Sequence, residues 1–372
     1  MKFSTSKTEL QQAFQKLSKA SPVRSTLPIL GCVLVASSDE KTIFRTTDLE
    51  LTIESEVPVS LEKAGSVAIP IRQLLDITNE LPETRISISA DDRNRVEIQT
   101  EMGTYDLMGK PADEFPATPE INQTKELSLP AKTLKNIIDT TLFAVSKDDL
   151  KPALTGVLFR FAPKNIIAVS TDGHRLVRYK EKDPGSIGFS GDIIAPRKFL
   201  SYLSTQLSAG DINISIGENY ITTRMNHDTV ITRTVGERFP DYESVIPKDN
   251  EKLLKADKES LLGAIRRVSI FSNRATHQVA MNLSSERCLV TTEDPETSSK
   301  AQEELPAEYK GDDLVIGYNA EYLQDVIKHI KSKTVFARFN TPISATLFNL
   351  EDNTEDKDGE TLMLLMPIRL NG

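Results

Sequence analysis

The chain has 372 residues and a formal net charge of −9, which favours solubility over nonspecific attraction to nucleic acid. Two cysteines, Cys32 and Cys288, lie far apart and outside any CxxC or Cys/His spacing, which argues against a disulfide framework and a zinc site. No export signal follows Met1, and the apolar run Leu362–Ile368 is too short to cross a bilayer. We therefore expect a soluble, cytoplasmic protein.

An amphipathic helix is predicted near the beginning of each third of the chain. In the first third, apolar residues recur at the i, i+3, i+4 and i+7 positions of a buried helix stripe: Leu10, Ala13, Phe14 and Leu17. A stripe of the same kind begins at Leu134 and another at Leu261. A second helix is predicted later in each third, over 72–81, 197–207 and 319–331.

The segments between these helices alternate apolar and polar residues, as strands with one buried face do. Examples are Arg85–Ser89 and Asp211–Ile216. Their polar neighbours and the turn-forming Asp, Asn and Gly residues between them favour antiparallel sheets. Each third is therefore predicted to be an α+β domain in which two helices cover a sheet.

A fixed period relates the three thirds. Separations of 124 and 127 residues connect the helix leucines Leu10, Leu134 and Leu261. The same separations connect three dipeptides near the ends of the thirds: Phe115-Pro116, Phe239-Pro240 and Met366-Pro367. This period suits three copies of one domain better than a solenoid, whose repeats have about 20–50 residues. The predicted domains are 1–121, 126–246 and 247–372.

Charge is distributed unevenly between the helices and the rest of the chain. Five of the six predicted helix segments carry more Lys and Arg than Asp and Glu, although the whole chain is acidic. One explanation is that Lys and Arg are good helix formers on solvated faces. The other is a basic surface, repeated three times, along which a polyanion could lie.

The common catalytic and cofactor-binding motifs do not occur in the sequence. The four histidines lie outside any HExxH motif, and no GxSxG nucleophile elbow is found. Gly185, Gly188 and Gly191 lack the Lys-Ser/Thr pair of a P-loop. The acidic run 351–360 places Leu365 where a calcium loop needs its bidentate Glu, so a solvated hairpin loop is expected there. We predict no catalytic residue, no metal site and no cofactor.

Four short segments connect the chain to a known family. They are Thr26–Gly31 (TLPILG), Thr171–Leu176 (TDGHRL), Arg238–Tyr242 (RFPDY) and Met366–Leu370 (MPIRL). In these segments, in their order and spacing, and in the threefold layout, the chain resembles the bacterial DNA polymerase III β subunits, the replicative sliding clamps. The resemblance extends over essentially the whole chain.

The resemblance implies three tandem DNA-clamp domains per chain and two chains joined head to tail into a ring. Twelve helices would line the hole, and the antiparallel sheets would form the outer rim. Such a homodimeric ring encircles double-stranded DNA without reading its sequence. It tethers the replicative polymerase, the clamp loader and other clients, which bind through short linear motifs. A threaded ring needs phosphate attraction only, because base contacts would stop it from sliding.

The resemblance also implies which residues contact DNA and which close the ring. The expected DNA-backbone contacts are Arg24, Arg72, Lys147, Lys151 and Arg197. The segment Lys147–Ala153 departs from the polar or aromatic residues of the family, which weakens the expectation for that loop. Ring closure is expected to use Tyr105, Leu107, Ile270 and Phe271, with Glu303 and Glu304 as candidate charged partners.

A pocket for the linear motifs of clients is the third implied site. It is expected to be lined by Leu154, Thr171, Gly173, His174, Arg175, Leu176, Pro240, Val245, Asn319, Tyr322, Ile343, Leu364, Met366 and Ile368. Apolar walls with a few polar groups suit an extended peptide that has one or two hydrophobic anchors.

Two other functions stay open from the residues alone. Asp172 and His174 could be the acid–base pair of a hydrolytic enzyme, although Asp172-Gly173 is also an ordinary turn dipeptide. Alternatively, the chain could be a static, sequence-specific DNA-binding protein, which its acidic net charge disfavours.

Overall fold

The structure is a computed structural model that describes residues 1–39, 41–119, 121, 124–182, 184–185, 187–348 and 359–370. The chain divides into two compact units. The first unit comprises Met1–Pro130 and Ala209–Thr234, and the second comprises Ala131–Ser208 and Val235–Gly372. Most of the acidic run 351–360 lies outside the described residues, so the hairpin loop expected there stays a prediction.

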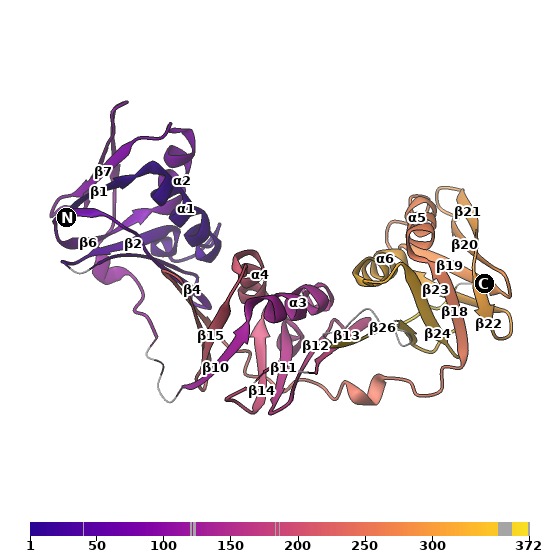
Figure 1. Cartoon of the computed structure of the whole chain (residues 1–372). Coiled ribbons are helices and arrows are strands. Elements are labelled where there is room, and N and C mark those ends of the chain that lie inside the picture. Colours follow the sequence, from indigo (N-terminus) through magenta and orange to yellow (C-terminus); the bar gives the residue numbers. More distant parts are fainter. Residues whose placement is uncertain are drawn as a thin grey trace. The chain divides into compact units, whose positions relative to one another are not determined.

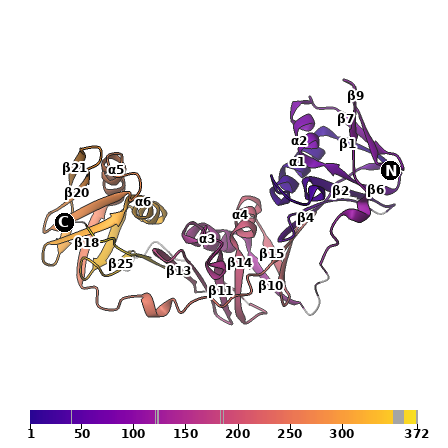
Figure 2. The ribbon, with the colours of Figure 1, turned by 180° about the vertical axis from the view of Figure 1, so that it is seen from behind.

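Within the part of the first unit that the structure describes, two α-helices lie side by side (Figures 1 and 2). These are α1 (Lys7–Leu17) and α2 (Ile71–Glu80). Helix α1 begins where the Ser6 hydroxyl accepts a hydrogen bond from the Glu9 N–H at 3.2 Å, a normal N-cap. Its predicted apolar stripe is buried, with Leu10 and Phe14 completely inaccessible to solvent.

Two antiparallel sheets complete the first unit. The five-stranded sheet has the order β5 (Ser60–Lys63), β1 (Lys2–Ser6), β7 (Arg85–Ala90), β8 (Arg95–Gln99) and β9 (Thr104–Met108). The eight-stranded sheet has the order β10 (Lys125–Pro130), β15 (Asp211–Ile216), β16 (Tyr220–Met225), β17 (Asp228–Arg233), β4 (Leu51–Glu56), β3 (Thr42–Thr47), β2 (Cys32–Ser37) and β6 (Gly65–Pro70).

Among its described residues, the second unit contains four α-helices and two further antiparallel sheets. The helices are α3 (Ala131–Thr141), α4 (Arg197–Gln206), α5 (Lys258–Ser269) and α6 (Ala320–His329). The nine-stranded sheet has the order β14 (Gly191–Pro196), β11 (Gly156–Ala162), β12 (Asn165–Thr171), β13 (Arg175–Glu181), β26 (Gly359–Leu365), β25 (Thr346–Phe348), β24 (Thr334–Phe339), β18 (Lys252–Asp257) and β22 (Glu308–Lys310). The four-stranded sheet has the order β21 (Ser299–Pro306), β20 (Arg287–Asp294), β19 (Gln278–Ser284) and β23 (Leu314–Asn319).

The threefold repeat is visible in the order of these elements. Each repeat begins with a strand and a helix, and its second helix directly follows a strand: β6, β14 or β23. The first helix of each repeat packs on equivalent strands, α1 on β3 and β4, α3 on β12 and β13, and α5 on β20 and β21. All six predicted helices and the two predicted strands are confirmed, as is the α+β class with three tandem domains.

Adjacent repeats are joined by strand pairing. Strand β4 of the first repeat pairs with β17 of the second, from Leu51 opposite Thr232 to Ser55 opposite Asp228. Strand β13 of the second repeat pairs in the same antiparallel manner with β26 of the third. The two longest sheets therefore each contain strands from two repeats, and the backbone hydrogen bonds run through both junctions.

A buried acid supports the first of these junctions. The Asp228 carboxylate accepts hydrogen bonds from the Lys16 ammonium at 2.7 Å and from the Ser55 hydroxyl at 2.6 Å. It thus ties strand β17 to helix α1 and to strand β4. The Asp228 side chain is only 8% exposed, whereas that of Lys16 is 35% exposed.

The cores are apolar and contain both cysteines. Cys32 packs with Ile29, Ala68 and Phe115 in the first unit, and Cys288 lies in the large core of the third repeat. Both thiols are free and buried. Among the described residues, no helix is long and apolar enough to cross a membrane.

The Asp228 contacts generate a stability prediction. Asp228→Ala leaves Ser55 and Lys16 without their acceptor, and we expect the free energy of unfolding to fall by about 1–3 kcal/mol. The loss stays below the 3–5 kcal/mol or so of a fully buried pair because Lys16 can turn toward water. Urea-induced unfolding measures the change. The control is Asp192→Ala, which removes an exposed partner of Arg160 and should cost about 0.5 kcal/mol or less. Equal losses in the two variants would show that the buried contacts of Asp228 stabilise the fold no more than an exposed ion pair does.

The cysteines generate a second prediction, because only the thiolate reacts with common thiol reagents. Burial raises the pKa of the Cys288 thiol to about 12 and also raises the pKa of Cys32, against the opposing charge of Lys110. We expect neither thiol to react with a chromogenic disulfide reagent at pH 8 in the folded protein, and both to react in denaturant. Rapid labelling of Cys288 in the folded state would show that the third-repeat core is open.

Candidate functional site

The turn between β12 and β13 is rigidly built. The Asp172 carboxylate accepts backbone hydrogen bonds from His174 at 2.9 Å and from Arg175 at 3.0 Å. Gly173 has a φ of +93°, a conformation in which a side chain would be strained. The Thr171 hydroxyl donates to the Arg175 carbonyl at 2.7 Å and accepts from the Gly173 N–H at 3.1 Å. The turn therefore holds its shape without a ligand, and it leaves the His174 side chain exposed.

Arg175 is a buried arginine next to this turn, with only 7% of its surface exposed. Its Nε donates to Asp172 at 3.0 Å, its Nη1 to Asp325 at 2.6 Å and its Nη2 to the Phe143 carbonyl at 2.9 Å. Two carboxylates compensate the charge, as burial of a guanidinium requires. Asp325 belongs to α6 of the third repeat, so Arg175 connects the second repeat to the third within the second unit.

Tyr322 of helix α6 contacts both His174 of the turn and Arg175. Its ring lies 4.8 Å from the guanidinium carbon of Arg175 and stacks on the His174 ring with centroids 5.5 Å apart. Burial raises the pKa of the Tyr322 phenol, Asp172 adds to the rise, and Arg175 opposes it. A neutral phenol thus contacts a cation through its ring, which is a favourable cation–π geometry.

The segment after β26 runs beside the turn and beside strand β23. The Met366 N–H donates to the His174 carbonyl at 2.8 Å, and the Ile368 N–H donates to the Gly317 carbonyl at 2.9 Å. A Cβ at Gly317 would lie 2.5 Å from Leu370 and 2.9 Å from the Ile368 carbonyl, so a glycine is needed for this close approach. Met366 remains 40% exposed.

Beneath this surface lies an apolar cluster. Leu176 and Leu364 are each 2% exposed and pack in one cluster with Tyr242. Pro240 and Val245, on either side of Tyr242 in sequence, are exposed, Val245 to 53%. Among the predicted pocket residues, His174 contacts both Tyr322 and Met366, while Leu176 and Leu364 are buried in this cluster.

Three other predicted pocket residues lie at the ends of neighbouring elements. Asn319 is the N-cap of α6 and accepts from the Glu321 N–H at 2.9 Å. Leu154 is half-buried at the end of the short 3-10 turn Pro152–Leu154. Ile343 is 65% exposed in the turn before β25. None of these three positions is buried in a core, and all belong to the second unit.

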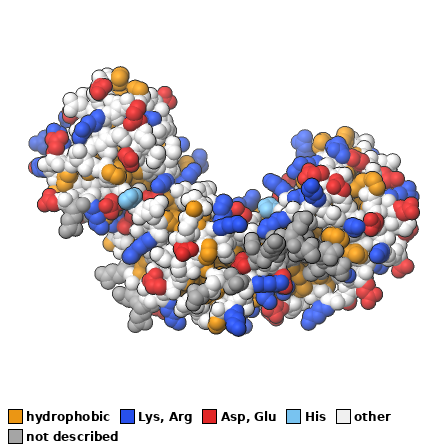
Figure 3. All heavy atoms as spheres, viewed as in Figure 1, with side chains coloured by type: hydrophobic (Ala, Val, Ile, Leu, Met, Phe, Trp, Pro, Cys, Tyr) orange, Lys and Arg blue, Asp and Glu red, His pale blue; other side chains and the backbone are white. Residues whose placement is uncertain are grey.

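The predicted DNA-contacting residues are placed at helix starts and in loops. Arg24, Arg72, Lys147 and Lys151 are exposed, and Arg197 is half-buried. Arg72 and Arg197 stand at the beginning of α2 and α4, which are equivalent helices of the first two repeats. On the face shown in Figure 3, lysine and arginine side chains occur over both units with acidic side chains between them, not as one uninterrupted patch.

The residues predicted for ring closure lie on two separate elements. Tyr105 and Leu107 are half-buried on β9, and Ile270 and Phe271, just after α5, are exposed to 77% and 48%. Glu303 and Glu304 of β21 are paired within the chain, Glu303 with Arg267 and Glu304 with Arg287 at 3.0 Å.

The geometry disfavours an acid–base pair of Asp172 and His174. The Asp172 carboxylate accepts from Arg175 and from two backbone N–H groups, and the His174 ring stacks on Tyr322. Among the described residues, no hydrogen bond joins the Asp172 carboxylate to the imidazole. Within the same residues, no group of three or more His, Cys, Asp and Glu side chains is placed to hold a metal ion.

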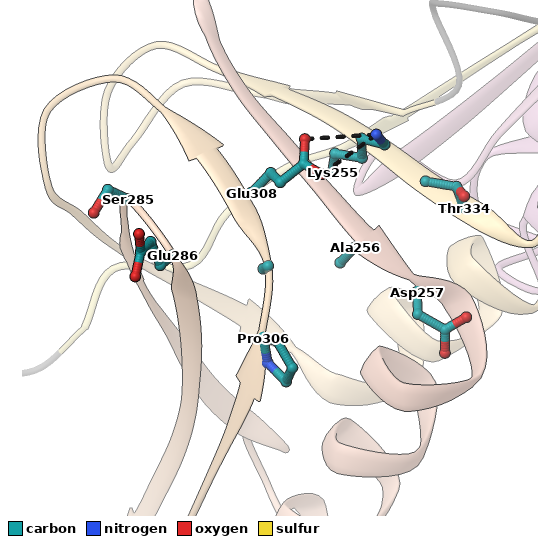
Figure 4. A pocket seen from close by; sticks show the side chains of 9 residues that line it. Lys255, Ala256, Asp257, Ser285, Glu286, Pro306, Glu308 and Thr334 are labelled. Atoms are coloured by element: carbon teal, nitrogen blue, oxygen red, sulfur yellow. Dashed lines mark hydrogen bonds and ion pairs between the residues drawn. The ribbon is translucent and has the colours of Figure 1, made fainter.

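An open cleft of about 390 Å³ in the third repeat is lined by residues of β18, of β22 and of the turn between β19 and β20 (Figure 4). Lys255 and Glu308 form an ion pair at 3.4 Å on its rim, and Asp257 caps helix α5 nearby. The first repeat has a similar cleft at the equivalent strands β1 and β5, lined there by Ser4 and Arg85 among others. Because the cleft recurs with different side chains, it is a feature of the fold and not a conserved arrangement of chemical groups.

Several residues of the site were not predicted from the sequence. Phe143 and Asp325 complete the surroundings of Arg175, and Gly317 accommodates the terminal segment. Asp325 is separated from Arg175 by 150 positions, and nothing in the local sequence links them. The spacing of Asn319, Tyr322 and Asp325 along one helix was the available signal, since side chains three positions apart share a helix face.

Comparison with known proteins identifies the family. Three family models of the DNA polymerase III beta subunit match this chain. The model of the N-terminal domain matches residues 1–119, that of the central domain 128–241 and that of the C-terminal domain 243–369. The chain is 30% identical over 374 positions to the beta sliding clamp of Escherichia coli strain K12, with both chains covered completely.

Solved structures agree with this match. The DnaN sliding clamp of Pseudomonas aeruginosa bound to griselimycin is 28% identical and has a TM-score of 0.90, with both chains covered completely. The DnaN clamp of Bartonella birtlesii bound to griselimycin is 27% identical and has a TM-score of 0.92 over the same coverage. The chain therefore belongs to the DNA polymerase III beta subunit family, the beta sliding clamps, and functions as a DNA sliding clamp and processivity subunit and not as an enzyme.

Proposed function

We propose that two copies of this chain join head to tail into a closed ring that encircles duplex DNA. In this assembly three domains per chain, over 1–121, 126–246 and 247–372, would supply twelve helices to the wall of the hole. We further propose that the ring tethers the replicative polymerase catalytic subunit, the clamp loader and other clients by their linear motifs. A clamp of this kind works where the chromosome is, in the cytoplasm.

The proposal rests on two strand edges at which the pairing between repeats could continue. Each repeat has one strand equivalent to β4 and a last strand equivalent to β9. The first of these, β4 or β13, pairs with the last strand of the next repeat, β17 or β26. The remaining members of the two types are β21 and β9. In the described structure each of these two pairs on one side only, β21 with β20 and β9 with β8. The same junction formed between copies would pair β21 of one chain with β9 of another.

A closed ring would pair every strand of these two types. A β21–β9 junction is heterologous, so it generates either a closed ring or an open filament. With two chains the number of equivalent junctions equals the number of domains, six, and no edge of these two strand types stays unpaired. Unpaired edges are liabilities that proteins avoid, which favours closure.

Apolar residues accompany both edges. Tyr105 and Leu107 lie on β9, while Ile270 and Phe271 are exposed close to the α5 helix that packs on β21. Exposed aliphatic and aromatic side chains of this kind are typical of a buried interface centre. The Arg267–Glu303 pair lies on the same elements, α5 and β21, and would stand at the rim.

DNA would be held by weak contacts to phosphates. We propose that Arg24, Arg72, Lys147, Lys151 and Arg197 make these contacts, four of them from exposed positions. Long, flexible cationic side chains attract the backbone without reading bases, and such contacts weaken strongly with salt. Processivity would then come from topology and not from affinity.

Clients would bind at the surface around the 171–176 turn. The preformed turn, the ring of Tyr322, the exposed Met366 and the apolar floor of Leu176 and Leu364 suit an extended peptide with hydrophobic anchors. Two relatives are bound to griselimycin in solved structures, and we propose that this chain binds griselimycin as well.

The ring interface has a direct test. A charge at Phe271 would be buried without a partner at the proposed junction, so Phe271→Asp should convert the native particle from two chains to one at micromolar concentration. Multi-angle light scattering measures the mass. Val315→Asp, which places the same charge on an exposed apolar residue of β23, is the matched control and should keep the mass of two chains. A single-chain mass for the unchanged protein would overturn the ring.

Topological binding has its own test. Protein incubated with nicked circular plasmid should stay bound through gel filtration at moderate salt, and cutting the plasmid once should release it. Streptavidin on biotinylated ends of the linear plasmid should restore retention, because blocked ends prevent the ring from sliding off. Equal retention on open linear and circular DNA would instead indicate a static DNA-binding protein.

A further inference from the structure

Arg175 belongs to a continuous series of ring contacts that extends beyond the proposed client pocket. From the pocket inward, His174 stacks on Tyr322 with centroids 5.5 Å apart, and the Arg175 guanidinium carbon lies 4.8 Å from the Tyr322 ring. The same carbon lies 5.4 Å from the ring of Phe143. Phe143 in turn stacks on His329 with centroids 3.9 Å apart and planes only 7° from parallel. We call these five residues the Arg175 stack.

Phe143 and His329 are not among the residues proposed to line the pocket, although His329 belongs to the same helix, α6, as Tyr322. Phe143 lies in the 3-10 turn Leu142–Ala144 that follows helix α3, and His329 is the last residue of α6. Both side chains are half-buried. Their parallel stacking brings the end of the second repeat's first helix onto the end of the third repeat's second helix.

His329 is also attached to the residue that compensates Arg175. Its Nδ1 lies 2.7 Å from the Asp325 carbonyl oxygen, one helical turn back, so the neutral ring donates its Nδ1–H there. The Asp325 carboxylate accepts from Arg175 at 2.6 Å. Burial lowers the pKa of His329, Lys328 and Arg175 add to the fall, and Asp325 opposes it, which favours the neutral ring beside the arginine.

We propose that Phe143 and His329 are positioning residues for client binding, acting through Arg175 although neither lines the pocket. The proposal rests on the client site proposed above. The Phe143 backbone carbonyl accepts from Arg175 at 2.9 Å while its ring contacts the guanidinium, so one residue fixes both the plane and the depth of the arginine. His329 fixes the Phe143 ring.

The consequence for the pocket follows from the contacts of Arg175. The Arg175 Nε–H donates to one carboxylate oxygen of Asp172. The other oxygen accepts from the backbone N–H groups of His174 and Arg175. The His174 carbonyl in turn holds the Met366 N–H. An arginine free to tilt would release Asp172, and with it the turn and the terminal segment that together present the client-binding surface.

Three variants separate stacking from other roles of His329. His329→Ala removes the stacked ring, His329→Phe keeps an aromatic ring but not the Nδ1–H, and Phe143→Leu keeps apolar bulk but not the ring. His227→Ala, an exposed histidine in the first unit, is the matched control. Aromatic pairs contribute effects of about 2- to 10-fold in an equilibrium, which sets the size of the expected change.

The first readout is amide hydrogen exchange by mass spectrometry, which needs no ligand. In His329→Ala and Phe143→Leu we expect exchange to rise about 2- to 10-fold in peptides covering 172–176 and 366–368, while His329→Phe and His227→Ala stay at the level of the unchanged protein. A rise confined to 142–146 and 325–331 would show that His329 serves only local packing and would overturn the proposal. An equal rise for His329→Phe would overturn it too.

The second readout is the dissociation constant for griselimycin, measured by calorimetry. We expect about 2- to 10-fold weaker binding for His329→Ala and recovery in His329→Phe. Unchanged affinity in His329→Ala, with griselimycin bound normally by the unchanged protein, would overturn the positioning role. If the unchanged protein does not bind griselimycin, the griselimycin assignment fails, and the exchange pattern still decides whether Phe143 and His329 hold the turn.

Discussion

Backbone pairing between repeats is the constraint on which the rest of this structure depends. A domain built from two short antiparallel sheets has open edges at which N–H and C=O groups lack partners. At the first junction β4 and β17 supply these groups to each other, and at the second β13 and β26 do so. The side chains then only have to fit a geometry that the backbone has already fixed. Asp228 shows this fit, since it reaches both Lys16 and Ser55 from the β17 side of a junction.

The same constraint places the helices and the functional surfaces. In every repeat the first helix packs on the strand equivalent to β4, which is β4, β13 or β21. The helices therefore repeat with the same period as these strands. Because the helices recur, Arg72 and Arg197 occupy equivalent positions at the starts of α2 and α4. The turn at 171–176 lies at the start of the junction strand β13, so the proposed client surface lies where two repeats meet, and Arg175 reaches Asp325 of the next repeat.

Much of this could be predicted from the sequence because it is local. The stripe of Leu10 to Leu17 predicts a helix, and the structure buries all four of its apolar residues. The alternation in Asp211–Ile216 predicts a strand, which is found with the same bounds. Which strand edges join could not be predicted, since pairing of β13 with β26 depends on geometry and not on any local pattern. The stacking of Phe143 on His329 was missed for the same reason, because both look like ordinary residues at the ends of helices.

The dipeptides near the ends of the three repeats occupy equivalent positions, but their first side chains differ in how deeply they are buried. Phe115 is buried against Cys32 in the first repeat, and Phe239 is half-buried against the cluster that contains Leu176. Met366 is instead 40% exposed, with its N–H on the His174 carbonyl. An aromatic ring at the first two positions seals an apolar cluster, whereas a flexible thioether can adapt to a varying partner. In the third repeat the side chain at this position is therefore partly exposed, which suits the client surface proposed above.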